Sequence, residues 1–438
     1  MGKKINSDIF VAGLGAISAI GNNVAECLSA LENEQAGIGD ITYLETVHRG
    51  MLPVAEVKLS NAELAIRAGV SPRITRTALL SLLAAKEALD DAGITIGSGT
   101  GSRSGFAGGQ GTGSRSGIAG EPGAVGGVSA TGARWRTGFI SANTVGGMDK
   151  TEKFFADFLS DPQNGRLRDV LQHECGAVTE WVADQLDIHD TVTTISTACS
   201  SSANAIFFGA RLIRHGMLDV VVAGGTDALT KFTLNGFNTL MILDQQYCKP
   251  FDENRKGLNL GEGAGYVVLV SEQVAASLQT ELYCRLSGYC NANDAYHQTA
   301  SSPDGTGSYL AMKGALEHSG LQPSDIGYIN LHGTGTQNND SAEGTAIRRL
   351  FDPHYPKMSS TKSFTGHTLG ACGGLEAVFS ALSVRQGLIY PNLRLETPMA
   401  EFPFVPVTTF SKNEPIRHVL SNSFGFGGNC SSLVFSKL

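Results

Sequence analysis

The chain has 438 residues, of which 42% are hydrophobic and only 17% are charged, so it holds enough apolar material for a large buried core and is not a disordered or fibrous protein. Its 41 acidic residues outnumber its 33 basic ones and give a formal net charge of −8, which argues against nucleic acid as the main partner. No apolar run approaches the length of a membrane span, so we expect no membrane partner. Eight scattered cysteines without a C-x-x-C pair, and no secretory signal ahead of them, favour reduced thiols and a cytoplasmic location.

The N-terminal part begins with a predicted strand from Ile9 to Ser18. Its Gly13-Leu14-Gly15 is a weak match to a dinucleotide-binding fingerprint, because the third glycine and the following acidic residue are missing, and we therefore predict no nucleotide cofactor. A short helix is expected at 24–34, and a longer one from Ser71-Pro72 to Ala92.

The segment from 97 to 133 consists mainly of Gly, Ser, Ala and Thr, and the heptamer GTGSRSG occurs in it twice. It has no periodicity and too little apolar mass to fold alone. We predict a flexible insert that is dispensable for folding and activity.

The central stretch of the chain runs from Thr191 to Gly216. A β-branched run, 191–195, predicts a short buried strand, and small residues then lead into an apolar helix that Gly216 ends. Cys199 lies at the strand-to-helix corner, where free backbone N–H groups and the helix dipole stabilise a thiolate. The simpler alternative is a buried core cysteine.

The C-terminal part continues the alternation of strands and helices. We expect strands at 220–225, 283–289, 326–331, 358–361, 418–421 and 431–435, and helices at 153–159, 168–186, 307–319 and within 364–387. This pattern predicts an α/β fold made of two similar halves, which we place at 1–255 and 256–438.

Two histidines, His332 and His367, follow strands in segments rich in glycine, where backbone can approach a substrate closely. One thiolate with two imidazole donors suits acyl-thioester chemistry. Lys362 precedes the second histidine by five residues, and Glu376 is its natural charge partner on the following helix. No Cys/His cluster has the spacing of metal ligands, so we predict no metal.

Several motifs together resemble the β-ketoacyl-acyl-carrier-protein synthases, the decarboxylating Cys-His-His type of the thiolase superfamily. The resemblance covers nearly the whole chain outside the 97–133 insert. The motifs that carry it are TACSSSANAI around Cys199, HGTGTQNND at 332–340, STKSFTGHTLGACGGLEA at 360–377, the terminal NSFGFGGN, PFDENRKGLNLGEGAG and NDAYHQTASSPDG.

The resemblance implies a thiolase-like fold of five α-β-α-β-α layers and a decarboxylative Claisen condensation. In this scheme Cys199 accepts the acyl chain, while His332 and His367 hold the malonyl thioester carbonyl as carbon dioxide leaves. Lys362 and Glu376 would organise the second histidine.

The resemblance also implies roles around the catalytic centre. The backbone N–H groups of Cys199 and Phe426 would form the oxyanion hole, with Phe426 as a gate to the acyl pocket. Thr334 and Thr336 would bind the pantetheine arm. The implied partners are an acyl carrier protein and a second copy of the chain, and we expect Arg73 and Arg76 to help dock the acidic carrier protein.

Two residues depart from the family pattern and leave the substrate open between fatty-acid and polyketide-type chains. Lys256 replaces the acidic residue common in the RDG turn, and Cys430 replaces the usual threonine in GFGGTN. Two other functions remain open: a non-catalytic partner subunit, which would lack the nucleophilic Cys199, and a thiolase, which would use a second cysteine such as Cys430.

Overall fold

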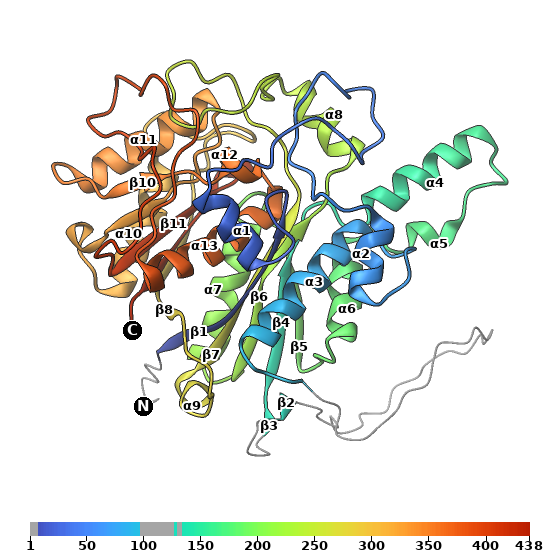
Figure 1. Cartoon of the computed structure of the whole chain (residues 1–438), viewed down its shortest axis with the longest axis horizontal. Coiled ribbons are helices and arrows are strands. Elements are labelled where there is room, and N and C mark those ends of the chain that lie inside the picture. Colours follow the sequence, from blue (N-terminus) through green and yellow to red (C-terminus); the bar gives the residue numbers. More distant parts are fainter. Residues whose placement is uncertain (1–7, 97–126, 129–133) are drawn as a thin grey trace.

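The structure is a computed structural model that describes residues 8–96, 127–128 and 134–438 (Figure 1). The predicted flexible insert at 97–133 therefore lies outside the described residues, except for a two-residue strand. That strand, β2 (Gly127–Val128), pairs antiparallel with β3 (Arg134–Trp135).

The first half of the chain forms five strands in the order β1-β7-β6-β4-β5. The strands β6 and β7 are rich in valine and almost wholly buried, as expected for strands covered on both faces. β4 pairs parallel with both β5 and β6, whereas β7 pairs antiparallel with β6 and β1. The bounds are β1 (Ile9–Ser18), β4 (Thr137–Ala142), β5 (Thr191–Ile195), β6 (Val220–Asp227) and β7 (Gly263–Ser271).

The second half repeats this arrangement, with the order β8-β12-β11-β9-β10. β9 pairs parallel with β10 and β11, and β12 pairs antiparallel with β11 and β8, so every pairing has its counterpart in the first half. The bounds are β8 (Cys284–Asn293), β9 (Tyr328–Asn330), β10 (Lys357–Ser359), β11 (His418–Phe424) and β12 (Asn429–Ser436). The prediction of two similar halves is confirmed.

The two five-stranded groups join where β1 pairs with β8 over only two residues, Phe10 and Val11. β7 belongs to the sheet of the first half through its pairs with β1 and β6. The predicted boundary at 255/256 is therefore too early, because it would separate β7 from its sheet. The glycine-rich turn before β7 has the composition of a linker, but its residues Lys256, Gly257 and Leu258 line a cavity.

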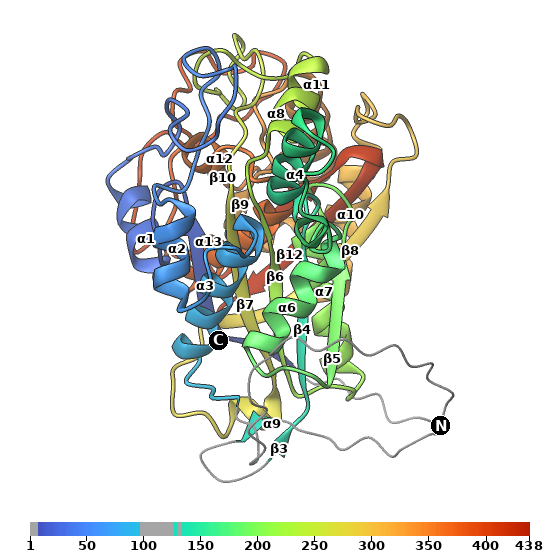
Figure 2. The ribbon, with the colours of Figure 1, turned by 90° about the vertical axis from the view of Figure 1, so that its right-hand side faces the viewer.

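Helices form three layers around these strands, which confirms the five-layered α/β architecture, stacked from left to right in Figure 1. Figure 2 looks along this stack, with the outer helices of the first half in front. In the middle, α7 (Ser201–Arg214) and α13 (Cys372–Gln386) contact strands of both halves. α3 (Arg76–Asp91) and α6 (Cys175–Gln185) cover the first half on its outer side, and α10 (Thr306–Ser319) with α11 (Gln337–Phe351) lies outside the second.

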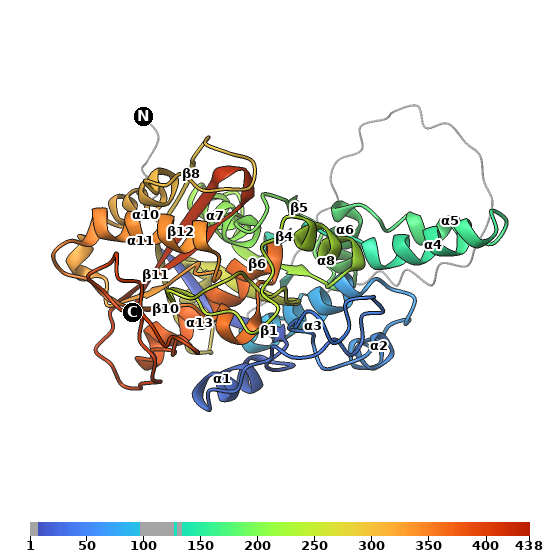
Figure 3. The same ribbon diagram turned by 90° about the horizontal axis from the view of Figure 1, so that it is seen from above.

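The remaining helices lie at the periphery or beside the active site. α4 and α5 extend away from the body of the molecule (Figures 1 and 3). None of the residues of α4 or α5 is fully buried. The bounds are α1 (Val24–Glu32), α2 (Asn61–Ala68), α4 (Met148–Ser160), α5 (Leu167–Val170), α8 (Lys231–Thr239), α9 (Glu272–Ala275) and α12 (Lys362–Thr365).

Two helix predictions differ from the structure. The helix expected from Ser71 begins only at Arg76, because the side chain of Thr75 caps it by accepting the backbone N–H of Ala78. The helix expected over 168–186 is broken between α5 and α6, and α6 restarts at Cys175. Among the described residues, no helix is long and apolar enough to cross a bilayer.

Candidate active site

Cys199 lies in the tight turn between β5 and α7, as predicted. The preceding Ala198 has φ of +53°, a left-handed conformation that only a tightly held turn imposes on a residue with a side chain. The hydroxyl of Ser201 fixes the turn by accepting the N–H of Thr197 at 2.7 Å. Gly425 passes so close that a Cβ there would lie 3.0 Å from the Cys199 nitrogen. The nucleophile thus sits where a segment from each half meets.

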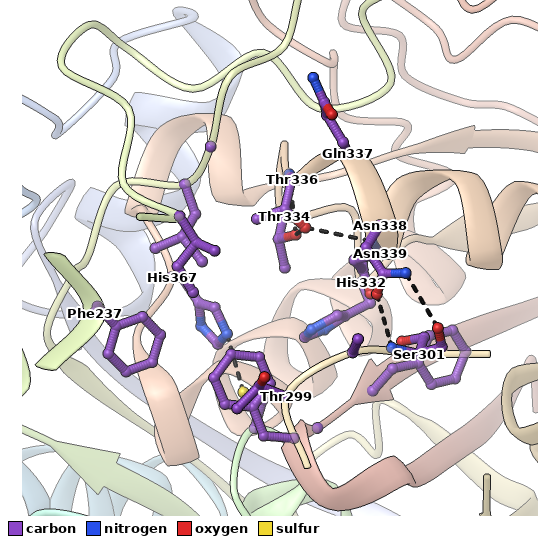
Figure 4. A pocket seen from close by; sticks show the side chains of 18 of the residues that line it. Phe237, Thr299, Ser301, His332, Thr334, Thr336, Gln337, Asn338, Asn339 and His367 are labelled. Atoms are coloured by element: carbon purple, nitrogen blue, oxygen red, sulfur yellow. Dashed lines mark hydrogen bonds between the residues drawn. The ribbon is translucent and has the colours of Figure 1, made fainter. Parts of the chain in front are cut away.

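Both predicted histidines reach this thiol. His332 follows β9, and His367 follows α12, so both come from the second half. The Nε2 atom of His367 lies 3.1 Å from the Sγ atom of Cys199 (Figure 4). The two imidazole rings are 5.5 Å apart between centroids and meet edge to face. The sulfur and one nitrogen from each ring lie within 4.8 Å of one another.

Hydrogen bonds fix the protonation of both imidazole rings. The backbone N–H of Leu369 donates to Nδ1 of His367 at 3.1 Å, and the ammonium of Lys362 donates to Nδ1 of His332 at 3.3 Å. A neutral ring whose Nδ1 accepts a hydrogen bond carries its proton on Nε2. Burial, followed by the charge of Lys362, lowers the pKa of both histidines well below the usual value. The site therefore presents two neutral Nε2–H donors.

Lys362 and Glu376 form a buried ion pair, which agrees with the predicted charge partnership. Burial lowers the pKa of Lys362, but the Glu376 carboxylate, together with smaller contributions from Cys372 and Glu343, raises it overall. The expectation that the pair organises the second histidine is wrong, because Lys362 contacts His332, the first one. The backbone N–H of Leu369 orients His367 instead, and sequence spacing could not reveal that contact.

The sulfur of Cys199 is surrounded by hydrogen-bond donors. Burial raises the pKa of its thiol to about 11, while the charge of Lys362 and the backbone N–H groups of Phe426 and Cys199 counteract the rise. These two N–H groups are the ones expected to form an oxyanion hole. Both N–H groups lie near the sulfur, since each opposes the rise in the pKa of the thiol.

Two buried acids that the sequence analysis missed hold the loop around His332. The carboxylate of Glu343 accepts the N–H groups of His332 and Gly333 at 2.9 and 2.8 Å, and burial raises its pKa to about 7. Asp340 accepts the N–H groups of Thr334 and Gly335 at 3.0 and 3.2 Å. Both acids lie on α11, which the sequence analysis did not predict. The apolar spacing Ala342, Ala346, Ile347 and Phe351 was the available signal for this helix.

Cys199, His332 and His367 line a cavity of about 400 Å³. Thr334 and Thr336 line it beyond the histidines, with their hydroxyls 2.9 Å apart (Figure 4). Phe426 lines it on another side and stacks on Phe237 of α8, with ring centroids 5.8 Å apart. The structure thus brings together eight of the predicted site residues, because six of them line this cavity and Lys362 and Glu376 lie behind its wall.

The two arginines proposed for docking behave differently. Arg73 is exposed in the turn before α3. Arg76 is buried and forms an ion pair with Glu262 at 2.6 Å, and it also donates to the carbonyls of Leu59 and Val57. The prediction for Arg76 is therefore wrong. Its charge is used inside the fold, where a buried carboxylate compensates for desolvation.

The geometry also tests whether Cys430 could act as a second reactive cysteine and whether the site could hold a metal ion. The thiol of Cys430, the candidate second cysteine of a thiolase, faces Ser308 at 4.0 Å and does not line the cavity. Cys199, His332 and His367 are close enough together to hold a metal ion. However, a metal ligand needs a free lone pair, and the Nε2 atoms of both rings carry protons. The donor set therefore fits hydrogen-bond donation to an oxygen.

Comparison with protein families gives two adjacent matches. Residues 6–275 match the model of the β-ketoacyl synthase N-terminal domain, and residues 283–396 match that of the C-terminal domain. The chain belongs to the β-ketoacyl synthase family. The expected family, its fold and its condensing activity are thereby confirmed.

Individual relatives agree with this assignment. A 3-oxoacyl-[acyl-carrier-protein] synthase 2 of Staphylococcus aureus (strain COL) is 32% identical over 99% of both chains. Among solved structures, the ishigamide ketosynthase/chain length factor has a TM-score of 0.85 at 25% identity and 99% coverage of both chains. The ketosynthase ApeO in complex with its chain length factor ApeC from Xenorhabdus doucetiae has a TM-score of 0.78 at 28% identity over all of both chains.

Proposed function

We propose that this chain condenses an acyl thioester with a malonyl thioester, both presented by an acyl carrier protein, and releases carbon dioxide. The reaction would extend a chain in fatty-acid or polyketide-type synthesis. The observation that carries this proposal is the pair of neutral Nε2–H imidazoles beside one buried thiol. Two neutral donors can stabilise an enolate oxygen without giving up a proton to it.

In the first half-reaction, the sulfur of Cys199 attacks the acyl carbonyl on the carrier arm. A carbon–sulfur bond forms to Cys199 and the one to the arm breaks, while the thiol proton passes to the departing arm thiolate. The N–H groups of Cys199 and Phe426 stabilise the oxyanion between these events. The product is an acyl-enzyme and a free carrier protein.

In the second half-reaction, the malonyl thioester carbonyl accepts hydrogen bonds from Nε2–H of His332 and His367. The bond to the carboxylate breaks, carbon dioxide leaves, and its electron pair forms the enolate. The enolate carbon attacks the acyl group on Cys199, so a carbon–carbon bond forms and the thioester to the enzyme breaks. The Cys199 thiolate then takes a proton from solvent.

The carrier protein is proposed to enter from the open end of the cavity. Thr334 and Thr336 have hydroxyls positioned along the wall between that end and the histidines, which supports a role in binding the amide-rich pantetheine arm. Arg73 remains a candidate docking cation because it is exposed in a net-acidic chain.

We also propose that the chain forms a homodimer. β5 is an edge strand whose residues are only half-buried, and such an edge can pair with a second copy. The projecting α4–α5 segment exposes Phe155, Leu159, Leu167 and Leu171, each more than half exposed. Light scattering on the purified chain tests this, since a monomer, or a dimer only with an unlike subunit, would contradict it.

A reducing compartment such as the cytoplasm is the proposed location. All eight cysteines are free thiols in the structure, which supports a reducing setting. Cell fractionation with an antibody to the chain tests this proposal, and recovery in an oxidising compartment would contradict it.

The two alternative functions have less support. A non-catalytic partner subunit would lack the nucleophile, whereas Cys199 and both histidines are present and mutually in contact. A thiolase would need Cys430 beside the reacting carbon, but that thiol faces Ser308.

Intact-protein mass spectrometry tests the proposed function directly. After incubation with acyl carrier proteins of different chain lengths, we expect an acyl adduct that maps to Cys199. Adding malonyl carrier protein should remove the adduct and yield a ketoacyl product. If folded protein forms no adduct with any acyl donor, the condensing function is wrong for this chain.

A further inference from the structure

The wall of the active-site cavity carries one fully charged side chain. Among the described residues that line it, both histidines are neutral, and the others are apolar or uncharged apart from Lys256. Lys256 is exposed, so its ammonium can meet a ligand while it remains partly solvated. A lone cation on an otherwise neutral wall favours a ligand with a negative charge at that position.

The backbone of Lys256 is held firmly beside the two threonines. The guanidinium of the preceding Arg255 donates to the carbonyls of Thr336 and Gln337 at 3.2 and 3.0 Å. The next residue, Gly257, packs closely on Gly335. A Cβ added to Gly335 would lie 2.8 Å from the carbonyl oxygen of Gly257. The lysine therefore projects from a rigid turn next to Thr336.

The Lys256 ammonium is free to bind a ligand. Its neighbours on this turn are already engaged, since Lys249 pairs with Glu396 at 3.0 Å and Arg255 lies 3.8 Å from Asp340. In the part of the chain that the structure describes, no carboxylate forms an ion pair with Lys256. A solvated lysine without a partner loses little on binding an anion, because no existing pair must break.

We propose that Lys256 binds the phosphodiester of the carrier protein's phosphopantetheine arm, an inference that rests on the proposed function. The thioester end of the arm must reach Cys199, and its amide-rich middle passes Thr334 and Thr336. The phosphodiester at the opposite end then lies beyond the threonines, at the level of Gln337, where Lys256 is anchored.

Two minimal substrates that differ by one phosphate test this proposal. The condensation is measured with an acyl thioester of phosphopantetheine and with the same thioester of pantetheine, and kcat/KM for the first is divided by that for the second. In Lys256→Ala this ratio should fall about fivefold, as expected for a partly exposed charge pair. Lys313→Ala, a matched exposed lysine on α10 outside the cavity, should keep the ratio within about twofold.

A charge-reversal variant and a salt titration test whether the effect on the kcat/KM ratio is electrostatic. Lys256→Glu should lower the ratio further than the alanine variant, and the ratio of the unmodified chain should decline towards the Lys256→Ala value as salt rises. An equal loss for both substrates would overturn the phosphate assignment, because a cation that acts on the thioester or on folding does not discriminate between them. If the unmodified chain converts neither substrate nor acyl carrier protein, the proposed function itself fails, which is a distinguishable outcome.

Discussion

Replacing Lys362 with methionine tests two roles of its ammonium, which orients the His332 ring and balances the charge of Glu376. The variant keeps the length of the side chain but removes the ammonium that donates to Nδ1 of His332 and pairs with Glu376. Without that donor, the His332 ring is free to carry its proton on Nδ1, and the site loses one of its two Nε2–H donors. Loss of one preorganised donor to an oxyanion costs about 10²- to 10³-fold in rate. We expect malonyl decarboxylation to fall by that factor.

The same variant has a pH-dependent effect on stability. Burial raises the pKa of Glu376 to about 7, and the nearby Lys362 opposes this rise, so removing the lysine raises the pKa of the carboxyl further. A carboxyl whose folded-state pKa is raised loses stability as the pH climbs from the unfolded pKa to the folded one. Relative to the unmodified chain, the additional loss falls above pH 7 and amounts to at most about 1.4 kcal/mol per pH unit.

Denaturant unfolding at pH 6 and pH 8 measures this effect, and the double variant Lys362→Met/Glu376→Gln is its control. The double variant should recover stability at pH 8, because the buried charge is gone, without recovering decarboxylation. If Lys362→Met decarboxylates malonyl thioesters within about threefold of the unmodified chain, Lys362 does not fix the His332 tautomer and the reasoning is refuted.

Three further predictions follow from the same geometry. Cys199→Ala should form no acyl adduct by mass spectrometry yet still release carbon dioxide from malonyl carrier protein, and equal loss of both activities would contradict this division of roles. Decarboxylation should remain undiminished between pH 7 and pH 6, because the pKa values of His332 and His367 lie well below 6.5 and both rings stay neutral; a fall with a midpoint near 6.5 would be inconsistent with neutral donors. Glu343→Ala removes the acceptor of two backbone N–H groups and of the Asn422 amide and should cost about 2–4 kcal/mol of unfolding free energy, whereas Glu343→Gln, which keeps an acceptor oxygen, should lose less in the same denaturant titration.

The residues that the sequence alone could identify are those whose chemistry depends on local surroundings. Cys199 follows a β-branched strand and precedes a helix, while Gly333 follows His332 and Gly366 precedes His367, so short-range patterns were enough to select them. Residues whose state depends on distant contacts could not be judged in this way. Arg76 resembled a surface cation until its ion pair with Glu262, 186 positions away, was known.

Helices and strands, too, could be predicted where local patterns define them and not where distant contacts do. The strands β1 and β5 were predicted with their observed bounds because their β-branched or small residues end at clear turns. The expectation that 191–195 is buried is wrong, because β5 is an edge strand and its residues are only half-buried. α11 was missed because polar residues dominate its surface, and two of its acids serve the His332 loop rather than solvent. Lys362 was assigned to the wrong imidazole ring for a related reason. It lies only five residues before His367 in the sequence, but in the fold it contacts His332.

The two-half architecture makes the catalytic centre an indicator of intact assembly. Cys199 comes from the first half and both imidazoles from the second, and the middle helices α7 and α13 contact strands of both. Neither half alone contains a complete set of reacting groups. A chain cleaved at the α9 connection would therefore regain condensation only when its fragments re-associate across those helices, so that turnover itself could serve as a split-protein reporter.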